Sequence, residues 1–210
     1  MTVRCVIYDC DGVLFDSIDA NRRLYNHICL SLGREPLTDD ETQFCHTHTV
    51  FEAVHHLFRA TPEVEERALE FLKGLDLKQY IAYLTMEPNL METLKALKER
   101  GILTAICTNR TTTMKHIVER FQLGPHFDLV VTALDVIHPK PHVESVEKIL
   151  HTLALGPQSA LFIGDSDVDR KTAENGGVAF VAYKNREISN GIFIDDHLAV
   201  LSLLGNDSPR

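Results

Sequence analysis

The sequence predicts a doubly wound α/β fold with a parallel sheet, interrupted by one all-helical insertion. Three observations lead to this prediction. An apolar, β-rich run occupies residues 3–8. Residues 17–85 then show only helical patterning. After Pro88, strand-like and helix-like segments alternate with short links, which is typical of βαβ units.

The first strand is expected over residues 3–8, where apolar side chains point to both faces, as in the centre of a parallel sheet. In the insertion, Leu24, Ile28 and Leu32 fall four residues apart and form one apolar stripe, and two further stripes follow. We therefore predict a core of residues 1–16 and 86–210 and a helical domain of residues 17–85. The expected hinges are residues 17–20 and 86–88.

In the second half, Asn89 is expected to cap a helix together with Glu92, and Gly101 to end it. Strands are predicted at 102–107, 129–132, 160–163 and 178–182, with helices at 114–121, 143–153 and 170–175. These elements predict a Rossmann-like, doubly wound parallel sheet. The polar segment 205–210 is expected to fray.

Composition narrows the function classes. The 210 residues are 44% hydrophobic and 24% charged, which is ordinary globular usage. A formal net charge of −9 offers no electrostatic footprint for nucleic acid or an anionic membrane. No run approaches the ~20 apolar residues of a membrane span. The five cysteines show no CxxC spacing, so we expect reduced thiols in a cytoplasmic protein.

Ligands of open α/β sheets bind beyond the carboxyl ends of the strands, so the strand ends are the candidate sites. Asp9 and Asp11 follow the first strand and, two residues apart, can face the same pocket. Two acids in one site favour a bound cation or one shared proton. The alternative is a solvated acidic turn that ends at Gly12.

Three further strand ends carry polar residues. Asp165, with Asp169 close behind, can add hard oxygen ligands that suit Mg²⁺, or can cap a helix instead. Thr108 and Asn109 can hold phosphoryl oxygens with a hydroxyl and backbone N–H groups, or can likewise act as a cap. Lys140, between two prolines, can neutralise a phosphoryl group or be an exposed loop lysine.

Taken together and in this order, these segments resemble the four motifs of the haloacid dehalogenase (HAD) superfamily. The first motif is matched by DCDGVLFDS at 9–17, the second by TN at 108–109, the third by KP at 140–141 and the fourth by GDSDVD at 164–169. The resemblance covers the whole predicted core. The helical insertion is similar to the C1-type cap of phosphoglycolate phosphatase-like members.

The resemblance implies Mg²⁺-dependent hydrolysis of a small phosphorylated metabolite through an aspartyl-phosphate. Asp9 would be the nucleophile, and Asp11 would act first as general acid and then as general base. Mg²⁺ would be held by Asp9, Asp165 and the backbone carbonyl of Asp11. The transferring oxygens would be held by Thr108, Asn109 and Lys140, and Asp169 would orient Lys140 or a metal-bound water.

Some positions depart from the family pattern and put the substrate in question. Val143 stands where relatives often have proline, and Arg110 follows the second motif, where it can reach the phosphate or pair with a surface acid. The cap segment FCHTHT at 44–49 lacks the glycine of many relatives. Its His46 and His48 are expected to face the active site and to read the substrate.

Two other functions remain open from the sequence. A sugar phosphomutase would use the same residues but return the phosphoryl group to its substrate. A catalytically silent binding module can share the fold. The sequence names neither the substrate nor the oligomeric state.

Overall fold

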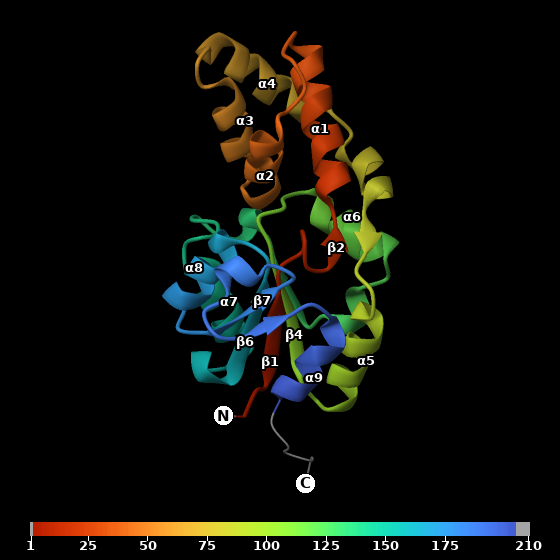
Figure 1. Ribbon diagram of the computed structural model, residues 1–210, viewed down its shortest axis with the longest axis vertical. Helices are drawn as coiled ribbons and strands as arrows, with labels where there is room; N and C mark the ends of the chain where they lie inside the picture. Colours follow the sequence, from red (N-terminus) through yellow and green to blue (C-terminus); the bar gives the residue numbers. More distant parts are fainter. Residues whose placement is uncertain (1, 205–210) are drawn as a thin grey trace.

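The computed structural model of the chain describes residues 2–204, so the segment 205–210 lies outside the described residues. A six-stranded sheet occupies one end of the molecule and a bundle of helices the other (Figure 1). The strand order is β5-β4-β1-β6-β7-β8, and every pair is parallel. This confirms the predicted doubly wound sheet. Its strands are β1 (Cys5–Tyr8), β4 (Leu103–Cys107), β5 (Leu129–Val131), β6 (Ala160–Gly164), β7 (Ala179–Tyr183) and β8 (Phe193–Ile194).

Each face of the sheet is covered by helices because β1 alternates its side chains between two apolar clusters. Val6 and Tyr8 join the cluster under α5 (Leu90–Glu99), α6 (Thr113–Arg120) and α9 (Val200–Leu203). Cys5 and Ile7 join the cluster under α7 (Glu144–Thr152) and α8 (Asp167–Asn175).

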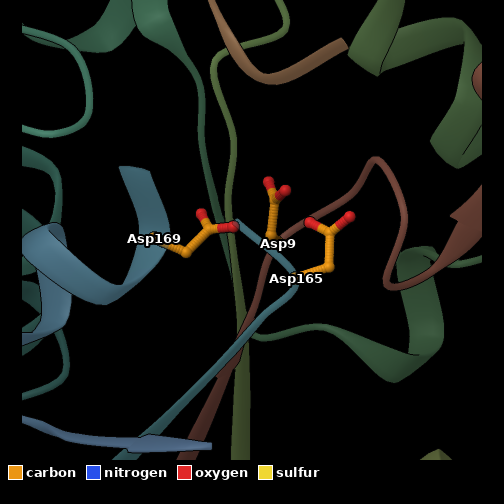
Figure 2. Close-up of side chains that lie close together, drawn as sticks. All are labelled: Asp9, Asp165 and Asp169. Atoms are coloured by element: carbon orange, nitrogen blue, oxygen red, sulfur yellow. The ribbon is translucent and has the colours of Figure 1, made fainter. Parts of the chain in front are cut away.

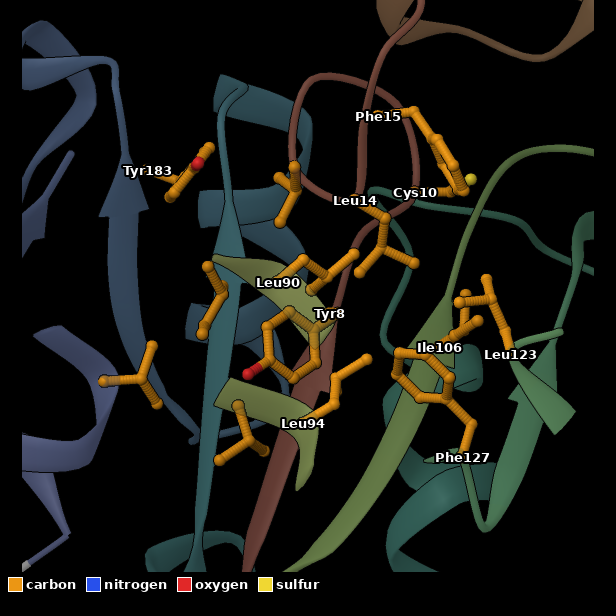
Figure 3. Close-up of a cluster of buried hydrophobic side chains, with 14 of the residues drawn as sticks. Tyr8, Cys10, Leu14, Phe15, Leu90, Leu94, Ile106, Leu123, Phe127 and Tyr183 are labelled. Atoms are coloured by element: carbon orange, nitrogen blue, oxygen red, sulfur yellow. The ribbon is translucent and has the colours of Figure 1, made fainter. Parts of the chain in front are cut away.

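Tyr8 lies at the centre of the first cluster (Figure 3). Leu90 and Leu94 of α5 lie close to its ring in this view, and Phe127 meets it edge-on at 6.0 Å between centroids. Each such large side chain stabilises the fold by about 1.5–3 kcal/mol when fully buried. The strand ends that carry the polar motifs are therefore held on a rigid support.

The insertion consists of helices, as predicted. They are α1 (Ile18–Ser31), α2 (Asp39–Thr47), α3 (Val50–Phe58), α4 (Pro62–Gly74) and the 3₁₀ helix η1 (Leu77–Tyr83), with a hydrophobic cluster of their own among α1 to α4. Capping boxes begin α2 at Thr38 and α3 at Thr49. No helix of the described chain is long and apolar enough to cross a bilayer.

Two short antiparallel strands, β2 (Phe15–Asp16) and β3 (Thr85–Met86), join the helices to the sheet. Ser17 is the N-cap of α1, so most of the stretch expected as the first hinge is the first turn of this helix. The chain enters and leaves the helical bundle side by side, because β2 pairs with β3.

The structure differs from the sequence prediction at the start of α5. Asn89 adopts a left-handed conformation with φ of 60°, and its side chain makes no cap hydrogen bond. Its amide instead donates to Asp196 Oδ2 at 2.6 Å. Gly101, with φ of +68°, follows the helix as expected. The prediction missed β8, α9 and five short 3₁₀ turns: η2 (Gly124–His126), η3 (Ala133–Asp135), η4 (Pro157–Ser159), η5 (Arg186–Ile188) and η6 (His197–Ala199).

The strand order reverses at β1. The chain runs outward from β1 to β4 and β5, and then returns to the other side of β1 for β6, β7 and β8. Ligands of such sheets bind beyond the carboxyl ends of the strands at this reversal. The segments that follow β1, β4 and β6 therefore meet at the expected site.

Candidate active site

Three carboxylates converge beyond the reversal point. Asp9 follows β1, Asp165 follows β6, and Asp169 belongs to the first turn of α8. One oxygen of each lies within 4.8 Å of the others. In Figure 2, Asp9 and Asp165 extend from neighbouring strand ends, while Asp169 points from α8 towards Asp9. The backbone N–H of Asp9 donates to the Ile163 carbonyl at 3.0 Å, which fixes the first two ends together.

Lys140 is the cation at the centre of this cluster. Its Nζ donates to Asp9 Oδ1 at 2.7 Å and to Asp169 Oδ1 at 2.6 Å, and only 3% of its side chain is exposed. It is therefore a buried ion-pair partner and not an exposed loop lysine.

Asn109 holds the backbone of Lys140 in place. Its Nδ2 donates to the Lys140 carbonyl at 3.0 Å, and its Oδ1 accepts from the Lys140 N–H at 3.1 Å. The sequence placed Asn109 near a phosphate. In the structure, its side-chain amide joins the segment after β4 to the Lys140 loop.

The orientation of Asp169 is fixed by a capping box. Ser166 Oγ donates to Asp169 Oδ2 at 2.6 Å, and the Asp169 N–H donates back to Ser166 Oγ at 3.2 Å. A Cβ on Gly164 would lie 2.3 Å from the Cβ of Asp169. Glycine at the end of β6 thus allows the helix to approach the strand this closely.

The cluster carries more negative charge than Lys140 neutralises. Burial raises the pKa of Asp9 to about 7; the charge of Asp169 adds to this effect and Lys140 opposes it. Burial, followed by the charges of Asp169 and Asp9, raises the pKa of Asp165 well above its usual value.

Such a set of buried carboxylate oxygens fits a hard divalent cation. The oxygens of Asp9 and Asp165 suit it best, because both oxygens of Asp169 are engaged by Lys140 and Ser166. Gly12 makes the approach possible: at its φ of +73°, a Cβ would lie 1.9 Å from Asp165 Oδ2.

Asp11 has a different environment from Asp9. Its Oδ1 accepts from Arg110 Nη2 at 2.6 Å. Burial acts to raise the pKa of Asp11, but Arg110 and then His46 outweigh this effect, so the pKa lies below its usual value. The side chain of Asp11 thus faces Arg110, in contrast to the three carboxylates around Lys140. The partner of Arg110 is therefore a buried acid of the first motif and not a surface acid.

Thr108 lies at the end of β4 with 2% exposure, and its Oγ1 accepts from the Arg110 N–H at 3.1 Å. It lines a cavity of about 70 Å³ together with Asp9, Lys140 and the helices of the insertion. The hydroxyl is therefore beside the acidic cluster, as the sequence predicts.

His46 and His48 lie in different surroundings. His46 Nδ1 is 3.0 Å from the Asn21 amide nitrogen, which donates to it, so its Nε2 carries the proton. That Nε2 lies 3.9 Å from Asp165 Oδ2. The ring of His48 instead stacks on Phe44 at 3.9 Å between centroids, and its Nδ1 lies 2.9 Å from the Phe44 carbonyl. Both residues border the cavity, but only His46 approaches the acidic cluster.

Sequence reasoning missed two residues of the site. Asn21 sets the tautomer of His46, and Ser166 orients Asp169. Ser166 could have been found, because serine three residues before an acid is a capping-box signal. Asn21 carries no local signal, because its partner comes from another helix.

Residues 6–183 match the family model of haloacid dehalogenase-like hydrolases. A phosphoglycolate phosphatase of Rhodobacter capsulatus is 30% identical over 187 residues, which cover 85% of this chain and 83% of the relative. A pyrophosphatase PpaX of Oceanobacillus iheyensis is 24% identical, with 87% of this chain and 84% of the relative covered.

Solved structures agree with the family match. A HAD-superfamily hydrolase of subfamily IA from Geobacter sulfurreducens superposes with a TM-score of 0.79 and 37% identity, covering 97% of each chain. The family match includes β1, β4, β6 and every residue of the acidic cluster with Lys140. From its sequence, its fold and the arrangement of its strand ends, this chain belongs to the haloacid dehalogenase-like hydrolase family.

Proposed function

We propose that this hydrolase, a phosphatase of its family, cleaves a small phosphate monoester with Mg²⁺ through an aspartyl-phosphate on Asp9. The observation that carries the proposal is the buried cluster of Asp9, Asp165 and Asp169 around Lys140. Relatives named phosphoglycolate phosphatase and pyrophosphatase support the substrate class of small phosphorylated molecules.

In the first half-reaction, an oxygen of Asp9 forms a bond to phosphorus as the bond from phosphorus to the leaving oxygen breaks. Lys140 offsets the repulsion between this carboxylate and the phosphoryl oxygens, because its Nζ lies 2.7 Å from Asp9 Oδ1. Asp169 keeps the ammonium group in that place. Thr108 Oγ1 and the backbone N–H of Asn109 bind the transferring oxygens.

Asp11 moves the protons of both half-reactions. It gives a proton to the leaving alkoxide, and then takes one from the water that attacks phosphorus. The bond from phosphorus to Asp9 breaks in that second step, and inorganic phosphate leaves. Among the protein's own groups the pKa values run against these roles, since that of Asp9 is raised and that of Asp11 is lowered. The roles therefore require a cation at Asp9, which would favour its ionised form, and release of Asp11 from Arg110, which lets Asp11 take up a proton.

Asp9, Asp165 and the backbone carbonyl of Asp11 would hold Mg²⁺. When bound, the cation shields the charge of the phosphoryl group and aligns it for in-line attack. Burial, and after it the charge of neighbouring carboxylates, raises the pKa of Asp9 and Asp165, and this excess of buried acid supports the assignment.

We further propose that residues 17–85 act as a cap over the leaving group and that His46 donates its Nε2–H into the site. The support is the position of His46 on α2, with its Nε2 3.9 Å from Asp165 Oδ2. A cap that closes in this way excludes water until the substrate is bound.

The test is hydrolysis of an aryl phosphate by the purified chain, followed as release of inorganic phosphate. We expect turnover with Mg²⁺ and none with EDTA. Asp9→Asn should lower kcat by at least about 10³-fold, because an amide cannot form the acyl phosphate. In EDTA at pH 5, its melting temperature should stay close to that of the parent, because Lys140 keeps Asp169.

Asp19→Asn is the matched control, since Asp19 is an exposed acid that pairs with Arg23 on α1. It should leave kcat unchanged. Activity of Asp9→Asn within tenfold of the parent would exclude Asp9 as the nucleophile.

A further inference from the structure

Arg110 stands where the phosphoryl site meets the cap. It directly follows the segment of Thr108 and Asn109, and 13% of its side chain is exposed. It lines the cavity together with Leu77 and Tyr80 of η1, and α6 packs against η1 just beyond it. A phosphoryl group bound between Asp9 and Thr108 directs its leaving group to this cap-side wall.

The donors of Arg110 are only partly used. A guanidinium has five N–H donors. Within the part of the chain that the structure describes, Nη2 donates to Asp11, and Nη1 reaches Thr113 Oγ1 only at 3.5 Å. Nε is buried and has no hydrogen-bond partner among the described residues. A buried charged donor without a partner is costly, which indicates that a ligand completes this set.

Lys140 has one N–H donor left. Two of its three N–H groups donate to Asp9 and Asp169, and the third is assigned to the transferring phosphoryl oxygens. Among the described residues that line the cavity, Lys140 and Arg110 are the lysine and arginine side chains. Arg110 is therefore the cation with donors left for a group other than the transferring phosphoryl.

The geometry of Arg110 selects the chemistry of that group. A guanidinium binds carboxylates and phosphates with two parallel N–H···O bonds, and its Nε and one Nη form such a fork. Asp11 Oδ1 occupies the Nη2 arm, while the Nε arm is empty in the described chain. An anion with two oxygens fills both arms, which a hydroxyl cannot do.

The position of Arg110 limits how far this anion can be from the reacting phosphorus. Arg110 lines the same cavity as Asp9 and Thr108. Its Nη2 lies 2.6 Å from Asp11 Oδ1, and Asp11 is two residues from Asp9, so an anion bound by Arg110 lies close to the phosphoryl group.

We propose that Arg110 reads a second anionic group on the substrate, a carboxylate or a phosphate, only a few atoms from the phosphoryl group. This anion takes the fork of Arg110; Asp11, freed from the ion pair, takes up a proton from solvent and can then give it to the leaving oxygen. Recognition and chemistry are then coupled, because a neutral leaving group leaves Asp11 paired with Arg110. The inference rests on the proposed phosphatase function and names its substrate class.

The experiment compares three substrates in the full-length protein with Mg²⁺. Phosphoglycolate and 2-hydroxyethyl phosphate differ only in a carboxylate against a hydroxymethyl group, and inorganic pyrophosphate tests a phosphate as the second anion. We expect kcat/KM of the parent to favour one or both anionic substrates over 2-hydroxyethyl phosphate by about 10- to 100-fold.

Arg110→Gln should remove that preference. It should lower kcat/KM for the preferred anionic substrate by about 10- to 100-fold. The value of kcat/KM for 2-hydroxyethyl phosphate should stay the same or rise, because Asp11 is then free of Arg110. Arg110→Lys should restore only part of the preference, since an ammonium group forms no fork. Arg22→Gln, which removes an exposed arginine paired with Asp39, is the control. It should leave kcat/KM unchanged for every substrate.

The outcomes separate the two proposals. Equal kcat/KM of the parent for all three substrates would overturn the role of Arg110 and leave the phosphatase function intact. This comparison needs no variant, so it holds even if Arg110→Gln does not fold. An equal loss for charged and neutral substrates in Arg110→Gln would show that Arg110 binds the transferring phosphoryl, which also overturns the inference. Absence of Mg²⁺-dependent hydrolysis with every substrate, an aryl phosphate included, would overturn both.

Discussion

At the scale of single residues, two aspartates of the same motif have opposite proton affinities. The pKa of Asp9 is raised, because the carboxyl group is buried and lies beside Asp169. The pKa of Asp11 is lowered, because Arg110 lies 2.6 Å away. The division depends on burial and on the charges that each carboxylate meets, not on the motif itself. Because a nucleophile must be ionised and a general acid protonated, the proposed roles require a cation at Asp9 and loss of the Arg110 contact of Asp11.

We predict that Asp11→Asn slows both half-reactions by about 10²- to 10⁴-fold for an alkyl phosphate, since the amide neither gives nor takes a proton. An aryl phosphate has a good leaving group, so its first half-reaction should recover while hydrolysis of the phospho-enzyme stays slow. Rapid acid quench with a ³²P-labelled aryl phosphate should then show phospho-enzyme accumulating. Unchanged aryl phosphate turnover without accumulation would mean that Asp11 has only a structural role.

At the scale of elements, the first turn of α8 serves both stability and the site. Asp169 is the third helical residue of a capping box and at the same time a partner of Lys140. The helix therefore begins with an acid whose second oxygen faces the cluster. This double use explains why α8 begins at Asp167, three residues earlier than its apolar pattern predicts.

We predict that Ser166→Ala destabilises the protein by about 1 kcal/mol and lowers kcat about tenfold, because Asp169 loses the hydroxyl that orients it. Thr38→Ala is the matched control: it removes the same kind of capping box from α2, where Glu41 has no contact with Lys140. Urea unfolding should show similar losses for both variants, whereas only Ser166→Ala should lose activity. Equal activities would show that Asp169 keeps its orientation without Ser166.

The end of α2 separates the two cap histidines. Thr47 is the last helical residue, and His48 has the extended angles φ −107° and ψ 167°. The His48 side chain therefore does not continue the helix face of His46, and its ring stacks on Phe44. The cap is thus expected to read the substrate through one imidazole rather than two.

We predict that His46→Ala lowers kcat/KM for the preferred metabolite about tenfold and has less effect on a small aryl phosphate, because a donor to the leaving group is lost. His48→Ala should leave kcat/KM unchanged for both substrates and should lower only the melting temperature, since stacking on Phe44 is lost. The measurement is kcat/KM of both variants with both substrates. Equal losses in His46→Ala would mean that His46 does not discriminate between leaving groups.

At the scale of the whole molecule, the topology concentrates negative charge at one edge of the sheet. Asp9 and Asp165 come from adjacent strands on account of the reversal at β1, and α8 adds Asp169. Folding therefore brings together carboxylates that are far apart in the unfolded chain. This arrangement costs stability in the absence of a cation, and the cost depends on pH.

The sign of that dependence follows from Asp9. Its pKa rises from 3.8 to about 7 on folding, so between these values the folded state holds a proton that the unfolded chain has released. Protonated Asp9 therefore adds to the free energy of unfolding. This contribution is fully present below pH 4 and is lost as the pH rises towards 7. The pKa of His46 and of His197 is lowered by burial, and these residues act in the opposite direction.

We predict that, in EDTA, the melting temperature of Asp9→Asn rises relative to the parent between pH 5 and pH 7.5. The difference isolates Asp9 because both proteins keep the histidines. Mg²⁺ at a hundredfold excess over its Kd should raise the melting temperature of the parent by about 5–10 °C at pH 7.5, and by less at pH 5. Sodium chloride at equal ionic strength is the control. A pH-independent difference, or the same Mg²⁺ shift in Asp165→Asn, would contradict the prediction.

The sequence by itself determined the layered architecture and the set of strand ends that carry the chemistry. Apolar periodicity is a local property, and it places β1, β4 and β6 and the helical insertion without knowledge of their neighbours. Parallel strands end at one edge, so Asp9, Thr108 and Asp165 are expected together before any contact is known. Strands of two residues, such as β2, β3 and β8, are too short to carry a period and were missed.

Only the tertiary structure decided which partner each polar side chain has. Arg110 meets Asp11 across 99 residues, Asn109 meets Lys140 across 31, and Asn89 meets Asp196 across 107. A polar residue that caps a helix, one that is exposed and one that binds phosphate cannot be told apart in the sequence. Their hydrogen-bond partners come from distant loops that meet only in the folded protein. The fold was thus readable from local patterns. The assignment of Arg110 to Asp11, from which the expected substrate follows, required the packed molecule, because burial and long-range pairing set the charge of each group.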